Sequence, residues 1–133
     1  MSRSRSTRRR VVHSPAEIRA IRKAAQATAW VRDQLSERVR PGMTTKDVDE
    51  LAGTLIRETG GTSSFHGYQG YPGQVCVSVD DVVVHGIGSP EVLIRPGQLV
   101  SMDVGVTIDG FTGDSAVSIG AGGTLRVREI PNG

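Results

Sequence analysis

Two aspartates lie on either side of an Asp-Gly pair at positions 109–110, a dipeptide typical of two-residue hairpin turns. This turn predicts that Asp114 lies opposite Gly105. It also predicts that Asp103 lies opposite Ala116, which makes the two aspartates diagonal neighbours on one face of a β-ribbon. Diagonal β-carbons are roughly 7 Å apart or slightly less. Two carboxylates that reach toward each other from this distance can hold a metal ion between them.

The two faces of this predicted ribbon differ in kind. Apart from the aspartates, the first face carries small residues: Ser101, Gly105, Thr112 and Ala116. The opposite face carries side chains suited to a core: Val100, Met102, Val104, Val106, Phe111 and Val117. We therefore expect one face to pack against the protein interior and the other to stay open.

Two carboxylates that face each other in a half-buried sheet repel and are poorly solvated, so a compensating partner is expected. A divalent cation would provide one. Oxygen ligands suit Mn²⁺, Fe²⁺, Co²⁺ or Zn²⁺, the last three more readily with an added imidazole. The alternative is that each aspartate faces solvent or pairs with one of the few basic residues near the hairpin: Arg95, Arg126 and Arg128.

Other residues with chemical potential precede the ribbon. His85 ends a β-branched run and is followed by a glycine, so its side chain can project into a cleft, although a structural role is equally open. Cys76 is expected to be a buried small residue, because no base is placed beside it to activate the thiol. Tyr68 and Tyr71 occupy a glycine-rich loop and can either line a pocket or close the core.

Two helices are expected ahead of these residues. Ser14 and Glu17 form a capping box with Pro15 at the first helical position, and apolar residues then recur at helical spacing over residues 15–39. Pro-Gly at 41–42 ends this helix. A second helix is expected to begin after Thr44 and to end at the glycine pair 60–61.

Strands are expected in the remainder of the chain. Residues 74–79 and 82–85 are β-branched, with a turn at 80–81 between them, while residues 62–73 and 86–97 indicate loops. Strands at 98–107 and 111–118 complete the ribbon. Helices followed by strands predict an α+β fold with an antiparallel sheet.

The composition limits the class of protein. The chain has 133 residues, which suits a single domain, and its one cysteine excludes an internal disulfide and suits a reducing compartment. No run of 18 apolar residues exists, so no transmembrane helix is expected. These features together predict a cytoplasmic globular protein.

The positive charge is concentrated at the N-terminus. Five of the 16 basic residues lie between Arg3 and Arg10, which leaves eleven against the 14 acidic residues. Residues 1–11 are expected to form a disordered Arg-rich tail. Such a tail can contact RNA, a ribosome surface or an acidic partner.

Six motifs in order resemble the N-terminal half of a type I methionine aminopeptidase, in the pita-bread metallopeptidase family. These motifs are Tyr68-Gln69-Gly70-Tyr71-Pro72, Cys76-Val77-Ser78-Val79, Val84-His85-Gly86-Ile87, Pro96-Gly97, Ser101-Met102-Asp103-Val104-Gly105 and Asp109-Gly110-Phe111-Thr112-Gly113-Asp114. The helical segments beginning at Ser14 and Pro41 are similar to the same family. The resemblance covers residues 12–119 and implies an incomplete pita-bread fold, with two helices followed by an antiparallel sheet.

The resemblance also implies a reaction, the hydrolytic removal of the initiator methionine from nascent chains. In the family, two divalent ions (Co, Mn, Fe or Zn) share a bridging water. Asp103 would then chelate one ion and Asp114 would bridge both, while His85 would contact the substrate amide and help to stabilise the tetrahedral intermediate. The implied pocket for the methionine side chain consists of Phe65, Tyr68, Tyr71 and Cys76.

The chain departs from the family beyond the ribbon. The family completes its site with one histidine and two glutamates from its second half, whereas no histidine follows His85 and Glu129 is the last acid. Residues 120–133 diverge from the family pattern. We therefore expect this chain to be incomplete, to be inactive by itself, to be marginally stable and to expose an apolar surface that the second half would cover.

Three other interpretations are open. A non-catalytic half-fold could bind RNA or a ribosome through its basic tail. A peptidase of the same fold could cleave before proline, although the predicted Tyr71 and Cys76 pocket argues against this. A dimer could supply the missing ligands, but an identical copy has no suitable surplus of His and Glu.

Overall fold

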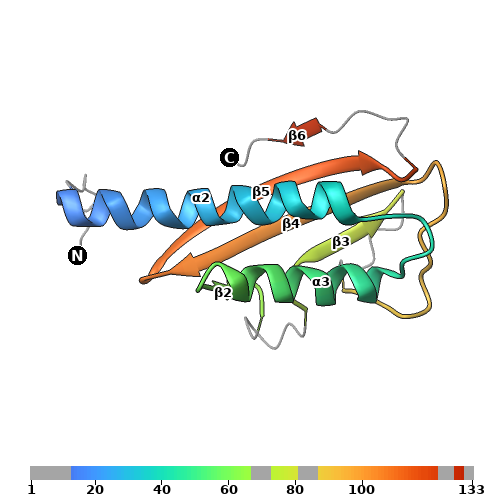
Figure 1. The fold of residues 1–133 in the computed structure, drawn as a ribbon, viewed down its shortest axis with the longest axis horizontal. Coiled ribbons are helices and arrows are strands. Elements are labelled where there is room, and N and C mark those ends of the chain that lie inside the picture. The colour runs from blue at the N-terminus through green and yellow to red at the C-terminus, as the bar shows by residue number, and fades with distance from the viewer. Residues whose placement is uncertain (1–12, 67–72, 81–86, 123–127, 131–133) are drawn as a thin grey trace, which may run out of the picture.

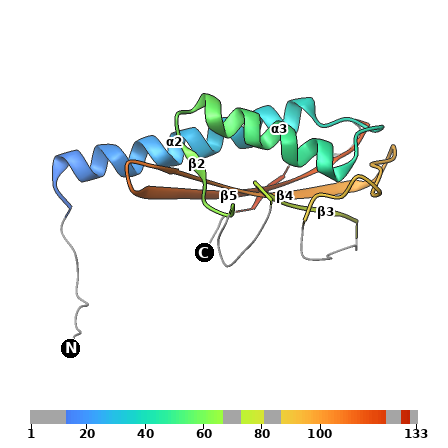
Figure 2. The same cartoon turned by 90° about the horizontal axis from the view of Figure 1, so that it is seen from below.

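Two helices cover one face of a five-stranded antiparallel sheet (Figures 1 and 2). The computed structural model describes residues 13–66, 73–80, 87–122 and 128–130. In chain order the elements are α2 (Pro15–Arg38), α3 (Thr45–Glu58), β2 (Thr62–Ser63), β3 (Cys76–Val79), β4 (Leu99–Ile108), β5 (Phe111–Gly120) and β6 (Arg128–Ile130). Strand β4 is central: β5 pairs with one of its edges and both β2 and β3 pair with the other. The predicted α+β class with an antiparallel sheet is confirmed.

Both helices begin where the capping residues predict. The Glu17 N–H donates to Ser14 Oγ at 3.1 Å, and the Ser14 N–H donates to the Glu17 carboxylate at 2.8 Å. Thr44 and Asp47 make the same reciprocal pair at the start of α3. These bonds satisfy N–H groups that have no partner within the helix. Helix α2 ends at Arg38, one residue before the predicted end.

The hairpin has the predicted register. Asp109 and Gly110 both have positive φ, at 54° and 83°, as a two-residue turn of the hairpin type requires. Asp114 pairs with Gly105 across the two strands, and Asp103 pairs with Ala116. The two aspartates therefore share one face of the sheet.

The prediction missed two short strands and misplaced the start of a third. The segment 62–73 was expected to be a loop, but it begins with β2, whose two residues pair with Thr107 and Val106. Strand β6 pairs with residues 116–118 of β5. Strand β3 begins at Cys76, two residues later than expected. Strands of two to four residues are too short for an alternating pattern to identify them, because long-range pairing is what stabilises them.

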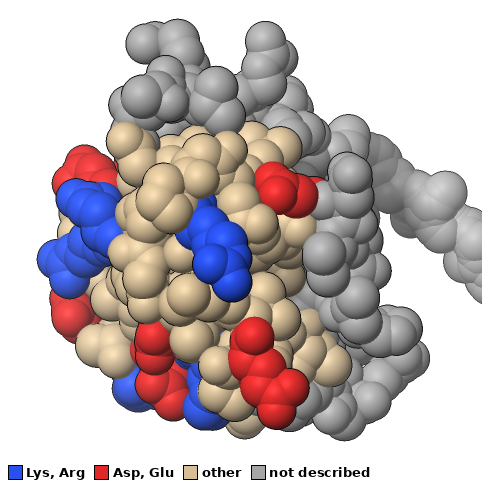
Figure 3. All heavy atoms as spheres, turned by 90° about the vertical axis from the view of Figure 1, so that its right-hand side faces the viewer, with Lys and Arg blue, Asp and Glu red and all other residues tan. Residues whose placement is uncertain are grey.

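Two of the predicted segments lie outside the described residues: the strand at 82–85 and the Arg-rich tail at 1–11. The expected contact of Arg3–Arg10 with RNA or a ribosome therefore stays a prediction. Figure 3 shows one end of the molecule, where the described acidic and basic side chains are interspersed. Across the described segments, neither helix has the length and apolar character that crossing a bilayer requires.

The core lies between the helices and the sheet. As expected, the helix-facing side of the hairpin is buried, although Phe111 is only half-buried because it adjoins the turn at the end of the sheet. The largest side chains that the core encloses are Val31, Leu35, Val48, Leu55, Ile56, Val75, Ile94, Val100, Met102, Val104, Val106 and Val117. Burial of these apolar side chains is the main contribution to the stability of the fold.

The opposite face of the hairpin carries mainly small and polar residues, as the alternation of side chains predicts. Hydroxyl groups pair across the strands on this face: Ser101 with Ser118 at 2.8 Å, and Thr107 with Thr112 at 2.7 Å. Exposed large apolar side chains occur on α2, in connecting segments and at the first residue of β4: Ile18, Ile21, Trp30, Ile87, Leu93 and Leu99. The open face of the hairpin is therefore suited to polar ligands.

Helix α2 lies directly on β5, and a glycine makes this approach possible. A Cβ at Gly113 would lie 2.7 Å from the Ala24 carbonyl oxygen and 2.7 Å from Thr28 Oγ1. Both distances are too short for a real contact, and the first atom belongs to the helix backbone. We therefore infer that the distance between α2 and β5 requires glycine at this position.

Gly113→Ala is expected to reduce the free energy of unfolding by about 1–3 kcal/mol, because the helix must move away from the sheet. Urea denaturation monitored by circular dichroism measures this change. The control is Gly53→Ala on α3, where the nearest atom is the flexible Gln74 side chain at 3.0 Å. Alanine also has the higher helix propensity, so this control should be close to neutral. An equal loss of stability in both variants would contradict the inference.

Candidate functional site

The two aspartates lie on the open face of the sheet, on the neighbouring strands β4 and β5. Asp103 pairs with Cys76 of β3 on one side and with Ala116 of β5 on the other. Asp114 leans over its partner Gly105: a Cβ at Gly105 would lie 2.9 Å from Asp114 Oδ1 and would overlap the Ser64 hydroxyl. The absence of a side chain at Gly105 thus creates the space that the Asp114 carboxylate occupies.

A hollow of about 280 Å³ brings the candidate residues together. It is lined by Phe65, Asp103, Val104, Asp114 and Ser115, and it opens to solvent. Phe65 follows the short strand β2, so a segment far away in the sequence meets both strands of the hairpin at this hollow. It combines one aromatic ring with two carboxylates.

The two aspartates repel each other electrostatically, as expected for like charges close together. Burial raises the pKa of the Asp103 carboxyl above its ordinary value, and the negative charge of Asp114 raises it further. Asp103 is exposed as a residue, yet the atoms around its carboxyl displace enough water to disfavour the charged form. Within the described segments, neither aspartate forms an ion pair with a basic residue. Among the described residues, nothing supports the alternative that the aspartates pair with a basic residue. The alternative that they face solvent is correct in part, because Asp103 is exposed as a residue.

The residues of the hollow fit a divalent cation only as part of a larger site. Two carboxylates offer hard oxygen ligands, and a cation between them would relieve their repulsion. The described residues contain no cluster of three or more His, Cys, Asp or Glu that could hold a metal. The pair can thus contribute two ligands, and the remaining ligands must come from other groups.

The connection between β2 and β3 is closed at its base by Ser63. The Ser63 hydroxyl donates to the Gln74 carbonyl oxygen at 2.6 Å. It also accepts from the N–H groups of Phe65 and His66, at 3.1 and 3.2 Å. One side chain therefore joins the two ends of the loop that carries the candidate pocket residues. We call residues Ser63 and Gln74 the stem.

Helix α3 positions the start of β3 through Asp49. The Asp49 Oδ1 atom accepts from the N–H groups of Gln74 and Val75, at 2.7 and 3.1 Å. These bonds satisfy two backbone donors just before Cys76. Asp49 therefore connects the helix layer to the strand that carries the only cysteine of the chain.

The predicted site residues can now be located. The structure brings Phe65, Asp103 and Asp114 to one hollow and places Cys76, which is half-buried, next to Asp103 in the sheet. The other predicted site residues, His85, Tyr68 and Tyr71, lie outside the described residues, so their roles stay predictions.

Several residues with a role around the site were missed. Thr28 lies at the same helical spacing as the apolar residues of 15–39, and the sequence pattern indicates no role for Arg32, Asp49 or Ser63. An acid at position 49, beside the apolar positions 48, 51 and 52 of its helix, was the clearest available signal. Its partners could not be identified, because they lie 25 and 26 residues away.

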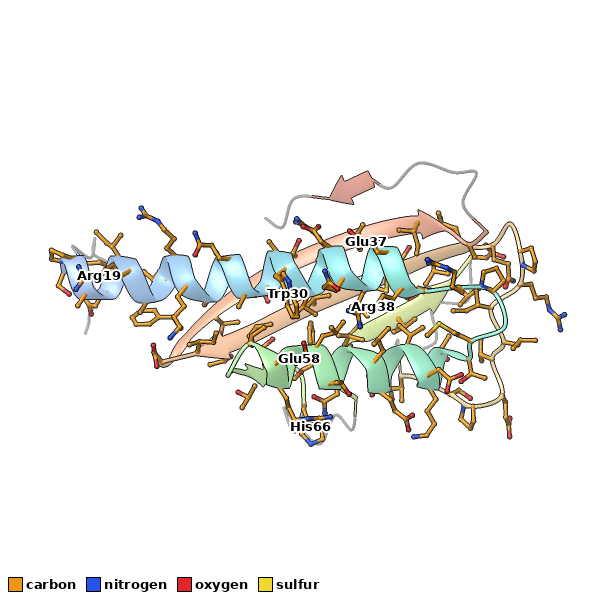
Figure 4. All side chains as sticks on the ribbon, in the orientation of Figure 1. Arg19, Trp30, Glu37, Arg38, Glu58 and His66 are labelled. Carbon is orange, nitrogen blue, oxygen red and sulfur yellow. The ribbon has the colours of Figure 1, made fainter. Side chains whose placement is uncertain are left out.

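A second hollow, of about 350 Å³, lies between the end of α3 and the stem. It contains no carboxylate among its lining residues, which are Ile56, Arg57, Gly61, Thr62, Ser63, His66 and Gln74. His66 lies beside α3 and Trp30 lies on α2 in Figure 4, and both helices cover the face of the sheet opposite the aspartates. Neither residue lines the hollow that holds the aspartates.

Comparison with known sequences identifies relatives. The model of metallopeptidase family M24 matches residues 19–130. Methionine aminopeptidase 1 of Mycobacterium tuberculosis is 42% identical over 116 residues, covering 86% of this chain and 44% of the relative. Methionine aminopeptidase 1 of Bacillus subtilis is 37% identical over 106 residues, covering 80% of this chain and 42% of the relative. The chain thus spans less than half the length of these relatives.

Comparison with solved structures gives the same assignment. Methionine aminopeptidase from Thermotoga maritima superposes with a TM-score of 0.78 at 35% identity, covering 86% of this chain and 46% of that structure. An X-Pro aminopeptidase from the same organism superposes with a TM-score of 0.66 at 20% identity, which shows a shared fold alone. The observed helices and sheet therefore correspond to part of a pita-bread fold.

Asp103→Asn is expected to raise the thermal midpoint at pH 7. An acid whose pKa is raised in the folded state is charged there at a cost, so its ionisation destabilises the fold. The cost is absent below the ordinary pKa of about 3.9, appears as the pH rises through the interval up to the folded pKa, and is complete above it. The gain should therefore vanish near pH 3. Thermal unfolding at pH 3 to 8 tests this, with the exposed Glu91→Gln as control, and a gain that is independent of pH would contradict it.

Asp49→Ala is expected to make the Cys76 thiol react several-fold faster with a disulfide reagent, because two N–H groups before β3 lose their acceptor. It should also destabilise the fold by about 1–3 kcal/mol. Asp49→Asn keeps an acceptor oxygen and should have a smaller effect. Asp47→Ala is the matched control, because it removes the acceptor of the Thr44 N–H on the same helix. Equal acceleration by both alanine variants would indicate general loosening instead.

Proposed function

This chain belongs to metallopeptidase family M24, and we propose that it supplies the N-terminal half of a metal-dependent aminopeptidase that removes the initiator methionine from nascent proteins. The observation that carries this proposal is the pair Asp103 and Asp114. These two carboxylates share the open face of one hairpin, without a basic partner in the described segments, inside the region matched by relatives named methionine aminopeptidase.

The proposed role of the pair is to bind divalent ions. Asp103 would chelate one ion and Asp114 would bridge two. The chemistry that the bound ions supply is activation of a water molecule and polarisation of the scissile carbonyl group. The raised pKa of Asp103 supports this role, because a site that disfavours adjacent negative charges favours a cation. The identity of the metal, among Co, Mn, Fe and Zn, is a matter for experiment.

The proposed substrate pocket surrounds the same hollow. Phe65 lines it with the two aspartates, and Cys76 is the neighbour of Asp103 on β3. An aromatic ring and a polarisable sulfur both suit contact with a methionine thioether. We propose that Tyr68 and Tyr71 complete this pocket and that His85 contacts the substrate amide.

For the 133 residues alone, we propose an incomplete site. Two carboxylates give a weak, open site, whereas a two-metal centre needs further protein ligands. The chain spans 44% and 42% of the length of its first two relatives, which is consistent with a half-site. We therefore expect no turnover from this chain in isolation.

Methionine release from the peptide Met-Ala-Ser in the presence of Mn²⁺ tests the function. The 133-residue chain should give none. A hybrid in which residues 19–130 replace the matched segment of Bacillus subtilis methionine aminopeptidase 1 should release methionine. Asp103→Asn or Asp114→Asn in the hybrid should lower kcat/KM at least about 100-fold, since loss of a ligand exceeds the effect of losing its supporting contacts.

The control variant of the hybrid is Glu91→Gln, at an exposed position outside the hollow. A folded hybrid that keeps its activity after Asp103→Asn would contradict the metal role. Preferential cleavage of an Xaa-Pro peptide over Met-Ala-Ser would show instead a peptidase that cleaves before proline.

A further inference from the structure

Helix α2 makes side-chain hydrogen bonds to the residues on both sides of Asp114. Thr28 Oγ1 lies 3.1 Å from the carbonyl oxygen of Gly113. Arg32 Nη1 donates to Ser115 Oγ at 3.0 Å. Residues 113 and 115 face the helix, so Asp114 between them faces the open side of the sheet. The aspartate is thus flanked by two contacts made on the opposite face.

The spacing of these contacts follows from the geometry of the two elements. Thr28 and Arg32 are four residues apart on α2, a rise of about 6 Å in an α-helix. Residues 113 and 115 are two apart on β5, which is about 6.8 Å in an antiparallel strand. One helical turn therefore has about the same length as two residues of the strand. Because α2 runs along β5 in the same direction, Thr28 reaches Gly113 and Arg32 reaches Ser115 (Figure 1).

Both contacts are shielded from solvent. Thr28 is 1% exposed and Ser115 is 9% exposed. The single hydroxyl hydrogen of Thr28 is shared between the Gly113 carbonyl and the Ala24 carbonyl, which lies 2.8 Å away. The Arg32 guanidinium is also held at the Asp33 carboxylate, at 3.0 Å. Buried hydrogen bonds with fixed partners restrict the strand more than exposed ones.

The strand needs such support at this position. Strand β6 pairs with β5 only at residues 116–118, so residues 111–115 pair with β4 alone among the described strands. Among the described residues, the edge of β5 beside Asp114 therefore has no strand partner. In addition, Asp103 and Asp114 are diagonal neighbours on one face of the hairpin, where two negative charges repel. Repulsion at an edge would move the Asp114 carboxylate unless its backbone were held.

We propose that Thr28 and Arg32 are positioning residues that hold Asp114 in place for metal binding. Neither side chain touches the hollow; both act through the backbone and side chain of the neighbouring residues of β5. The inference deepens the proposed function and rests on it for the metal. Its structural part, the anchoring of residues 113–115, stands on the contacts alone.

Mn²⁺ binding by the purified 133-residue chain, measured by electron paramagnetic resonance, tests the proposal. Thr28→Val removes the hydroxyl with little change of shape and should weaken Mn²⁺ binding about 10-fold, as loss of a supporting contact does in metal sites. Thr28→Ser should restore the affinity. Arg32→Met, which keeps the apolar stem but removes the donors, should weaken binding to a similar extent.

Thr45→Val is the matched control. Thr45 is also a buried helix threonine, 3% exposed, and its hydroxyl bonds to Ser89 far from Asp114 in the chain. Thr45→Val should lower the free energy of unfolding about as much as Thr28→Val does. It should change the Mn²⁺ affinity less than about twofold, because the 10-fold loss expected for Thr28→Val comes from a contact specific to the site. Equal weakening by Thr28→Val and Thr45→Val, or none by Thr28→Val and Arg32→Met, would overturn the proposal.

Amide hydrogen exchange in the absence of metal separates this proposal from the proposed function. If the wild-type chain alone does not bind Mn²⁺, the activity of the hybrid and of its Asp103→Asn variant decides the metal role, and exchange at residues 113–116 decides the anchoring. Faster exchange there in Thr28→Val than in Thr45→Val would uphold it. Equal exchange in these two variants would overturn it.

Discussion

The left-handed backbone of Asp109 and Gly110 decides which residues of β4 and β5 face each other. Because side chains alternate along a strand, a register shifted by one residue would exchange the two faces of one strand. An aspartate would then point at the helices, and a valine would point at solvent. The burial of the core and the pairing of the carboxylates thus depend on the same two-residue turn.

The two faces of the sheet differ in what they contribute: one face packs in the core, and the other carries the polar residues. The helix-facing side holds aliphatic residues whose burial stabilises the fold, while the open side holds hydroxyls, small residues and the two acids. The two ionised carboxylates destabilise the folded state, as the raised pKa of Asp103 indicates. Sites that conflict with folding in this way are typical of functional regions, and the surrounding structure must compensate for them. Here the compensation comes from the helices behind the sheet.

The success of the sequence predictions follows the range of the interactions involved. The helix starts and the hairpin register depend on residues within a few positions of each other, such as Ser14 with Glu17 and the turn at 109–110, and they were predicted well. The facing of Asp103 and Asp114 then followed from strand alternation alone. The placement of Phe65 beside them came only from resemblance to a family.

Long-range contacts were beyond the reach of the same reasoning. The carboxylate of Asp49 accepts from residues 25 and 26 positions away, and Arg32 donates to a hydroxyl 83 positions away. Strand β2 exists because Thr62 and Ser63 find partners on β4, not because two residues carry a pattern. In the sequence of an amphipathic helix, a polar side chain that contacts another element cannot be distinguished from one that faces solvent.

The stem formed by Ser63 and Gln74 allows the segment between β2 and β3 to vary in evolution. Strands β2 and β3 pair with the same edge of β4, and a single hydroxyl closes the loop between them. The loop can therefore gain, lose or exchange residues while its two ends stay where they are. Asp103 and Asp114 belong to the hairpin and are independent of its length. The architecture thus allows the segment between β2 and β3 to change in length or sequence while the positions of the two carboxylates stay the same.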